Sequence, residues 1–167
     1  QALLAYPHVT PFDVLAGRAL LESITMVVVF TLIVITLQLS GKALPIYSLF
    51  NVLIGILLLT IFSIGIGMLN SAIRIYFDSW DKLFSAANRP LYFLSGIFFT
   101  AASLPPQVRE YLQWNPIFQY IEWIRSGFFA TSTNYYINHE YAFGSAMIMF
   151  LIGLSLTQYT REKARNL

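Results

Sequence analysis

The chain has 167 residues, of which 57% are hydrophobic and only 11% are charged. Soluble domains carry about 25% charged residues, so this composition excludes an ordinary soluble domain and favours a chain that lies in a bilayer. The net charge of +2 with scattered basic residues gives no basis for nucleic-acid binding, and the absence of cysteine excludes disulfides and Cys-based metal or redox sites within these residues.

Four apolar segments are long enough to cross a membrane. A hydrocarbon core of about 30 Å requires about 20 apolar residues in a helix. We therefore predict an all-α polytopic membrane protein with four transmembrane helices, at about 19–39, 46–72, 83–103 and 141–160. Buried helices of a large soluble protein are the alternative, but four such segments in so short a chain make it the poorer explanation.

The basic residues predict the orientation. Four spans place the segments 1–18, 73–82 and 161–167 on one side of the membrane and the segments 40–45 and 104–140 on the other. The first side carries Arg18, Arg74, Lys82, Arg161, Lys163 and Arg165, whereas the other carries Lys42, Arg109 and Arg125. Because basic residues concentrate in cytoplasmic loops, we expect the first set of segments to be cytoplasmic.

Small residues recur at intervals of four in the second predicted span, at Ser63, Gly67 and Ser71, with Gly65 beside them. Small side chains at this spacing let another helix backbone approach closely. Packing within the chain and contact with a second copy both remain open.

Two charges, Glu22 and Arg89, lie inside predicted spans. A charge at the bilayer centre costs at least ~2.5–3.5 kcal/mol, so such residues find partners or face water. Arg89 can form a structural ion pair with Glu22 or Asp78. Alternatively, its guanidinium can bind the phosphate of a lipid-linked substrate, since this group bonds phosphate through two N–H donors.

The segment between the last two spans predicts a pair of short re-entrant or interfacial helices, at 106–113 and 116–130. Asn115 is expected to cap the second helix, with Pro116 at its first position. Glu122 and Arg125 are three residues apart on this helix and can pair. Helices this short and apolar do not span; they dip into the membrane or lie at its surface.

Aromatic residues concentrate in and around the same segment, and they allow two interpretations. Trp and Tyr often form belts at the membrane interface. Alternatively, some of these rings face a pore and stack on sugar rings. The residues concerned are Tyr111, Trp114, Tyr120, Trp123, Tyr135 and Tyr136.

No enzyme signature stands out. His8 and His139 are predicted on opposite sides of the membrane, so they cannot share a metal, and Asp78 and Asp81 do not have the Asp-x-Asp spacing of metal–sugar-nucleotide sites. A Gly-rich phosphate-binding loop is also absent. We therefore predict no catalytic residue, metal site or cofactor in this chain. A membrane-embedded glycosyl- or acyltransferase that uses Asp78, Asp81 or His139 is the alternative.

Several stretches occur in an order that carries a resemblance. They are Pro7-His8-Val9-Thr10-Pro11-Phe12-Asp13 followed by Arg18 and Glu22, the run from Arg89-Pro90 to Phe98-Phe99, then Leu104-Pro105, Trp114-Asn115-Pro116, and Glu122 with Arg125. In this order the chain resembles the type-2 ABC exporter permeases of the capsular-polysaccharide and O-antigen (polysialic-acid-type) branch. The resemblance covers essentially the whole chain.

The resemblance implies a homodimeric permease of the bacterial inner membrane with six transmembrane helices per subunit. Because the chain begins with Gln1 rather than Met, we expect its first two spans to be missing. Two ATPase subunits would bind ATP and Mg²⁺, and the cargo would be a lipid-linked polysaccharide. A teichoic-acid, lipid or drug exporter is a near variant, and the part played by periplasmic or outer-membrane export proteins stays open.

The resemblance also assigns roles to three sets of residues. Those expected to couple to the ATPase are Tyr6, Pro7, His8, Val9, Thr10, Pro11, Phe12 and Asp13. Those expected along the substrate path are Arg89, Tyr92, Phe93, Phe98 and Phe99. Those expected at an outer gate are Trp114, Asn115, Pro116, Tyr120, Trp123 and Arg125.

Overall fold

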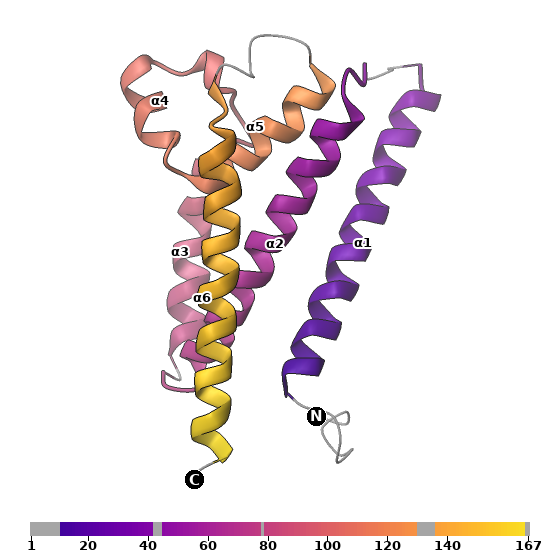
Figure 1. Ribbon diagram of the computed structural model, residues 1–167. Coiled ribbons are helices and arrows are strands. Elements are labelled where there is room, and N and C mark those ends of the chain that lie inside the picture. The colour runs from indigo at the N-terminus through magenta and orange to yellow at the C-terminus, as the bar shows by residue number, and fades with distance from the viewer. Residues whose placement is uncertain (1–10, 42–44, 78, 130–135, 166–167) are drawn as a thin grey trace. The chain divides into compact units, whose positions relative to one another are not determined.

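The computed structural model describes residues 11–41, 45–77, 79–129 and 136–165, and the chain divides into two compact units, Gln1–Leu44 and Pro45–Leu167. Figure 1 shows that the described residues form helices and connecting turns, with no strand among them. Three helical segments are long and apolar enough to cross a membrane: Gly17–Leu39, Leu49–Arg74 and His139–Thr160. The all-helical prediction is confirmed, whereas the fourth span stays a prediction.

The helix of the N-terminal unit is α1 (Pro11–Leu39), which ends before Gly41, a residue with a positive φ of 73°. Its hydroxyl groups are satisfied within the helix, because Thr25, Thr31 and Thr36 each donate to the carbonyl oxygen four residues earlier. A lipid environment offers a hydroxyl no water to bond, so this local bonding suits a helix that crosses the membrane.

Two long helices, α2 (Leu49–Arg74) and α6 (His139–Arg165), pack against each other in the C-terminal unit. Both begin at the same end of this unit and run in the same direction (Figure 1). The Ser48 side chain accepts a hydrogen bond from Asn51 N and caps α2. The buried residues of α2 recur every three or four positions, as helix packing requires: Val52, Gly55, Leu58, Phe62, Gly65, Met68 and Ala72.

The backbones of α2 and α6 approach closely where two glycines meet. A Cβ added at Gly65 would lie 2.7 Å from the carbonyl carbon of Met149, and one added at Gly153 would lie 2.4 Å from Gly65 O. A Cβ at Gly67 would meet nothing within 4 Å. The predicted stripe through Gly67 therefore does not make this contact, since Gly65 and Gly67 are about 200° apart around the helix.

The helix α3 (Trp80–Leu94) has 15 residues, so it is about 22 Å long. The segment predicted as one helix over 83–103 is helical only to Leu94. It continues through a turn, in which Gly96 has a φ of 84°, into the 3-10 helix η2 (Ala101–Ser103). No residue of α3 is buried. The prediction of one continuous helix is therefore wrong beyond Leu94.

Polar contacts hold the turn between α2 and α3. Trp80 Nε1 donates to Asn70 Oδ1 at 2.9 Å, and Arg74 Nε lies 3.1 Å from Asp81 Oδ2. The ion pair is exposed and contributes little by itself. The indole bond is partly buried and fixes the start of α3 beside the last turns of α2.

Two short helices, α4 (Pro106–Leu112) and α5 (Pro116–Phe128), follow the turn as predicted. The Asn115 side chain accepts a hydrogen bond from Ile117 N, so the predicted cap of α5 is confirmed. Both helices lie at the end of the C-terminal unit where α2 and α6 begin (Figure 1).

Candidate functional site

The helix α5 is buried on most of its surface. Its buried residues are Phe118, Gln119, Tyr120, Glu122, Trp123, Ser126, Gly127 and Phe128. Tyr120 is 0% exposed and Trp123 is 8% exposed, and both belong to the core cluster formed with α2 and α6. Neither ring is therefore exposed to line a pore, whereas their place in an interfacial belt and at an outer gate stays a prediction.

The Tyr120 hydroxyl is hydrogen-bonded in this core, at 3.2 Å from Ala142 O and 2.8 Å from Ser145 Oγ. Burial raises the pKa of Tyr120 above its usual value. The phenol therefore stays neutral near pH 7 and keeps its donor, which links α5 to the first turns of α6.

Backbone contacts attach α5 to α2. The amides of Tyr47 and Ser48 donate to Gly127 O at 2.9 and 3.0 Å. A Cβ at Gly127 would lie 2.4 Å from Val52 Cγ2 and 2.7 Å from Ser48 O. The end of α5 and the start of α2 are thus in direct contact, and only glycine fits at this position.

Gln119 joins three segments, and the sequence analysis missed it. Its side chain is 1% exposed, donates to Gln113 O at 2.9 Å and accepts from Asn138 N at 3.0 Å. It thereby connects the end of α4 with the start of α6 through α5. An amide within an otherwise apolar stretch of helix was the available signal.

The predicted pairing of Glu122 with Arg125 is confirmed, and within the pair Glu122 is buried and Arg125 is partly buried. The Arg125 guanidinium bonds Glu122 Oε1 and also donates to Phe99 O at 3.2 Å and Gly96 O at 2.8 Å. Glu122 Oε1 in turn accepts from Ala101 N at 3.2 Å. We call these five residues the Glu122–Arg125 network.

The network supplies hydrogen bonds to backbone that has left the helix. Beyond Leu94 the chain cannot use the helical ladder, so its buried carbonyl and amide groups need other partners. The side chain of Glu122 is 1% exposed and that of Arg125 is 17% exposed, so these bonds form away from water. Gly96 is required here, because its φ is positive and a Cβ would lie 2.5 Å from the Phe118 ring.

The residues expected along the substrate path are only partly brought together. The rings of Tyr92, Phe93 and Phe98 lie 5.6–6.1 Å apart and each is more than half exposed. Phe99 instead packs on Phe118, with the ring centroids 6.2 Å apart. The three exposed rings form one aromatic cluster at the end of α3.

The two charges predicted inside spans have separate environments. Glu22 pairs with Arg18, one turn earlier on α1, with Arg18 Nε 3.0 Å from Glu22 Oε1. Arg89 is exposed on α3 and has no ion pair among the described residues. The structure therefore gives Glu22 a local partner and leaves the Arg89 side chain accessible.

Part of the predicted site lies outside the described residues. This holds for five of the residues expected to couple to an ATPase, Tyr6, Pro7, His8, Val9 and Thr10, and for Asp78 and Tyr135. The remaining coupling residues, Pro11, Phe12 and Asp13, form the first turn of α1.

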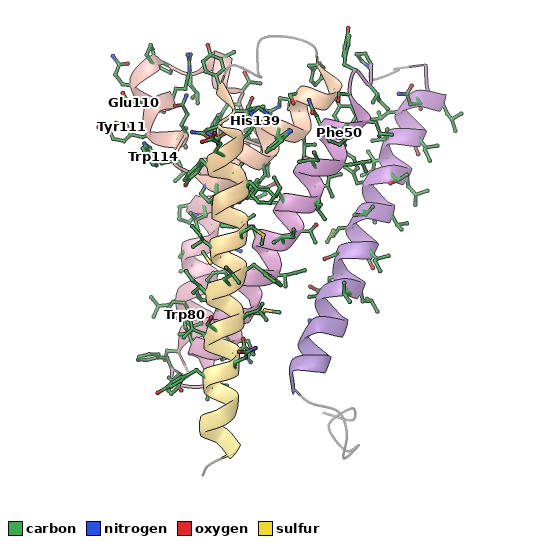
Figure 2. All side chains as sticks on the ribbon, in the orientation of Figure 1. Phe50, Trp80, Glu110, Tyr111, Trp114 and His139 are labelled. Atoms are coloured by element: carbon green, nitrogen blue, oxygen red, sulfur yellow. The ribbon has the colours of Figure 1, made fainter. Side chains whose placement is uncertain are left out.

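Exposed aromatic residues lie on α4 and just after it. Tyr111 is 81% exposed and Trp114 is 72% exposed, and Figure 2 shows both beside Glu110, near the end of the unit where His139 begins α6. The Tyr141 ring meets Trp114 edge to face at 5.8 Å. Their exposure agrees both with an aromatic belt at the membrane interface and with rings that face a pore.

The residues of the alternative enzyme site lie far apart within the C-terminal unit. Asp81 lies next to Trp80 at the start of α3, whereas His139 packs edge to face on Trp123 at the other end of the unit (Figure 2). Among the described residues, no three His, Cys, Asp or Glu side chains are grouped to hold a metal. Asp81 and His139 therefore cannot act on one substrate group.

Comparison with known proteins agrees with the helical architecture. The family profile described as ABC-2 type transporter matches residues 1–129. The chain is 31% identical over 164 residues to the polysialic acid transport protein KpsM of Escherichia coli, an alignment that covers 98% of this chain and 63% of that protein.

Two further relatives carry similar names. The chain is 27% identical over 155 residues to the capsule polysaccharide export inner-membrane protein CtrC of Neisseria meningitidis, covering 93% of this chain and 58% of CtrC. It is 26% identical over 161 residues to the capsule polysaccharide export inner-membrane protein BexB of Haemophilus influenzae, covering 94% and 59%. The chain thus spans 58–63% of the length of these relatives. On the family match and the helices that accompany it, the chain belongs to the ABC-2 type transporter family.

Proposed function

We propose that the chain is the larger part of the permease subunit of an ATP-driven exporter, which moves lipid-linked capsular polysaccharide or O-antigen across the bacterial inner membrane. The observation that carries this proposal is the similarity over 98% of the chain to a polysialic acid transport protein. The names of CtrC and BexB, both capsule polysaccharide export proteins, support the same cargo class.

The proposed topology has four spans, with the α4–α5 pair entering the membrane from the outer side. The end of α2, the start of α3 and the end of α6 lie at one end of the C-terminal unit, and α4 and α5 lie at the other (Figure 1). The first end carries Arg74, Lys82 and the last turns of α6, whose basic residues are Arg161, Lys163 and Arg165. The positive-inside tendency therefore supports a cytoplasmic location for that end.

The proposed mechanism divides the work between two kinds of subunit. ATP and Mg²⁺ bind to a separate ATPase, whose movement reaches the permease through Tyr6–Asp13 and α1. Two copies of the permease enclose the path, with the exposed rings of Tyr92, Phe93 and Phe98 on it. Arg89 is accessible and has the chemistry to bond a phosphate of the lipid carrier. The helices α4 and α5 form the outer gate.

A teichoic-acid, lipid or drug exporter of the same type is the near alternative, and the aromatic cluster at the end of α3 favours a sugar cargo. Flat aromatic faces stack on the apolar faces of sugar rings, so a polymer can slide along them. The transferase alternative has less support, because Asp81 is paired with Arg74 and His139 lies at the other end of the unit.

The proposal is tested by purifying the full-length protein with its ATPase and measuring ATP hydrolysis and polysaccharide export in vesicles. We expect the purified polymer to stimulate hydrolysis, and deletion of 6–14 to abolish ATPase binding while the protein still inserts. A variant with Asp78→Ala and Asp81→Ala serves as the control and should export within a few fold of wild type. Loss of function in this control, with ATPase binding intact, would favour the transferase.

A further inference from the structure

The two ends of α3 are attached to the rest of the C-terminal unit, whereas its middle is not. At its start, Trp80 bonds Asn70 of α2. At its end, Asn115 Nδ2 donates to Leu94 O at 3.1 Å, and the Glu122–Arg125 network holds the turn that follows. No residue of α3 is buried between these points. The position of its outer end therefore depends on these polar contacts together with the packing of Phe99 on Phe118 in the turn that follows.

The Glu122–Arg125 network has the geometry of an attachment. A guanidinium presents a planar set of donors in fixed directions, and here it bonds two carbonyls of the turn and one carboxylate of its own helix. Glu122 bonds a third backbone group, Ala101 N, where the turn enters η2. Two points of the turn and the start of η2 are thereby fixed relative to α5.

The helix α5, to which the network attaches the turn, is itself held in place by α2 and α6. Gly127 O accepts two amides that precede α2, and the Tyr120 hydroxyl bonds the start of α6. The turn also carries Phe98, whose ring belongs to the exposed aromatic cluster with Tyr92 and Phe93. Fixing the turn to α5 therefore fixes these rings relative to the gate helices.

We propose that Glu122 and Arg125 are positioning residues, which hold the aromatic cluster at the end of α3 in a constant position relative to α5 while the permease changes state. This inference deepens the proposed function and rests on it for the meaning of the cluster and the gate. Neither residue needs to touch the cargo, since Glu122 is buried and the partly buried Arg125 directs its donors at the turn and at Glu122.

The test measures the distance between the turn and α5 in the full-length permease bound to its ATPase. Spin labels are attached to cysteines introduced at Ile97, which is 46% exposed, and at Phe129, which is 44% exposed. The 167 residues contain no cysteine of their own, so within them only these two positions react. We expect one narrow distance distribution, unchanged when the ATPase is trapped with ATP.

Arg125→Gln removes the guanidinium N–H donors and should broaden the distribution of distances between the two labels. Export should fall about tenfold, within the range of coupling changes found for residues that link two sites, while ATP hydrolysis continues. A purely structural role would lower both activities together with the amount of assembled complex. Arg74→Gln breaks the exposed pair at the other end of the unit and should leave the distribution narrow.

Two results would overturn the inference: a distribution in Arg125→Gln as narrow as in wild type, or a broadened distribution with undiminished export. If Arg125→Gln does not accumulate, Arg125→Lys replaces it, because lysine keeps the charge and lacks the guanidinium N–H donors; it too must broaden the distribution. If the wild-type complex moves no polysaccharide, the proposed function fails, and the distance distributions still decide whether the network holds the turn.

Discussion

The contact between α2 and α6 gives a sharp prediction, because two glycines of α2 differ in their surroundings. We expect Gly65→Ala to destabilise the protein relative to Gly67→Ala. A Cβ at Gly65 would lie 2.7 Å from the backbone of Met149, whereas one at Gly67 has open space. Since backbone atoms cannot rotate away as a side chain does, α2 and α6 must move apart.

The magnitude follows from a comparison of the two variants. Replacing glycine by alanine in a helix gains about 1 kcal/mol of backbone entropy, and this gain cancels between two positions of one helix. The difference that remains is the cost of overpacking, about 1–3 kcal/mol. Lipid supplies no hydrophobic force between helices, so close packing carries much of their association.

The assay is thermal unfolding of the full-length protein in detergent, with both variants measured side by side. For a protein of this size, 1 kcal/mol shifts Tm by about 2–4 °C. Gly153→Ala should behave like Gly65→Ala, since its Cβ would lie 2.4 Å from Gly65 O. The double variant with Gly65→Ala and Gly153→Ala should lose less stability than the two single variants lose together, because the first change has already separated the helices. Equal Tm values for Gly65→Ala and Gly67→Ala would refute the reasoning.

Two further substitutions test the contacts of α5. Tyr120→Phe removes the hydroxyl bonded to Ser145 and should lower the free energy of unfolding by about 1 kcal/mol; Tyr111→Phe, at an exposed ring, should have no effect in the same assay. Gly127→Ala should cost about 1–3 kcal/mol, because its Cβ would meet Ser48 O at 2.7 Å, whereas Gly144→Ala meets nothing within 4 Å and should not destabilise. If a variant and its control lost equal free energy of unfolding, the described packing would be contradicted.

Local signals in the sequence predicted the helices well. The apolar runs indicated α1, α2 and α6, and the Asn115-Pro116 pair predicted the start of α5. These signals work because length and capping depend on residues near in sequence. The predicted pairing of Glu122 with Arg125 succeeded for the same reason, since their spacing places them on adjacent turns of one helix.

The contacts between helices were less predictable. The concentration of aromatic residues does not tell which rings another helix covers, so Tyr120 and Trp123 were assigned to the interface or a pore, whereas both pack in the core with α2 and α6. The spacing of Ser63 and Gly67 likewise indicated a face of α2 open to close approach, whereas Gly65 makes the contact. Which of several small residues a neighbouring helix meets depends on the tertiary arrangement.

The end of α3 shows why the prediction of one helix over 83–103 was wrong beyond Leu94. Hydropathy extends the third predicted span to residue 103, because the turn 95–100 is as apolar as the helix before it. Irregular backbone at membrane depth is tolerated only where protein or a water-filled cavity satisfies its polar groups. Arg125 and Glu122 provide those partners from α5, more than twenty residues further along the chain.

The two charges of this network are not interchangeable. Arg125 retains two backbone acceptors if the carboxylate is lost, whereas Glu122 without Arg125 keeps a single bond, from Ala101 N. Its second oxygen, Oε2, is buried and has no hydrogen bond among the described residues. Removing one partner of a buried pair is costly because the other charge stays uncompensated. The arginine therefore supplies the partners of two carbonyls that follow the end of the helix at Leu94, and it compensates the charge of the buried glutamate.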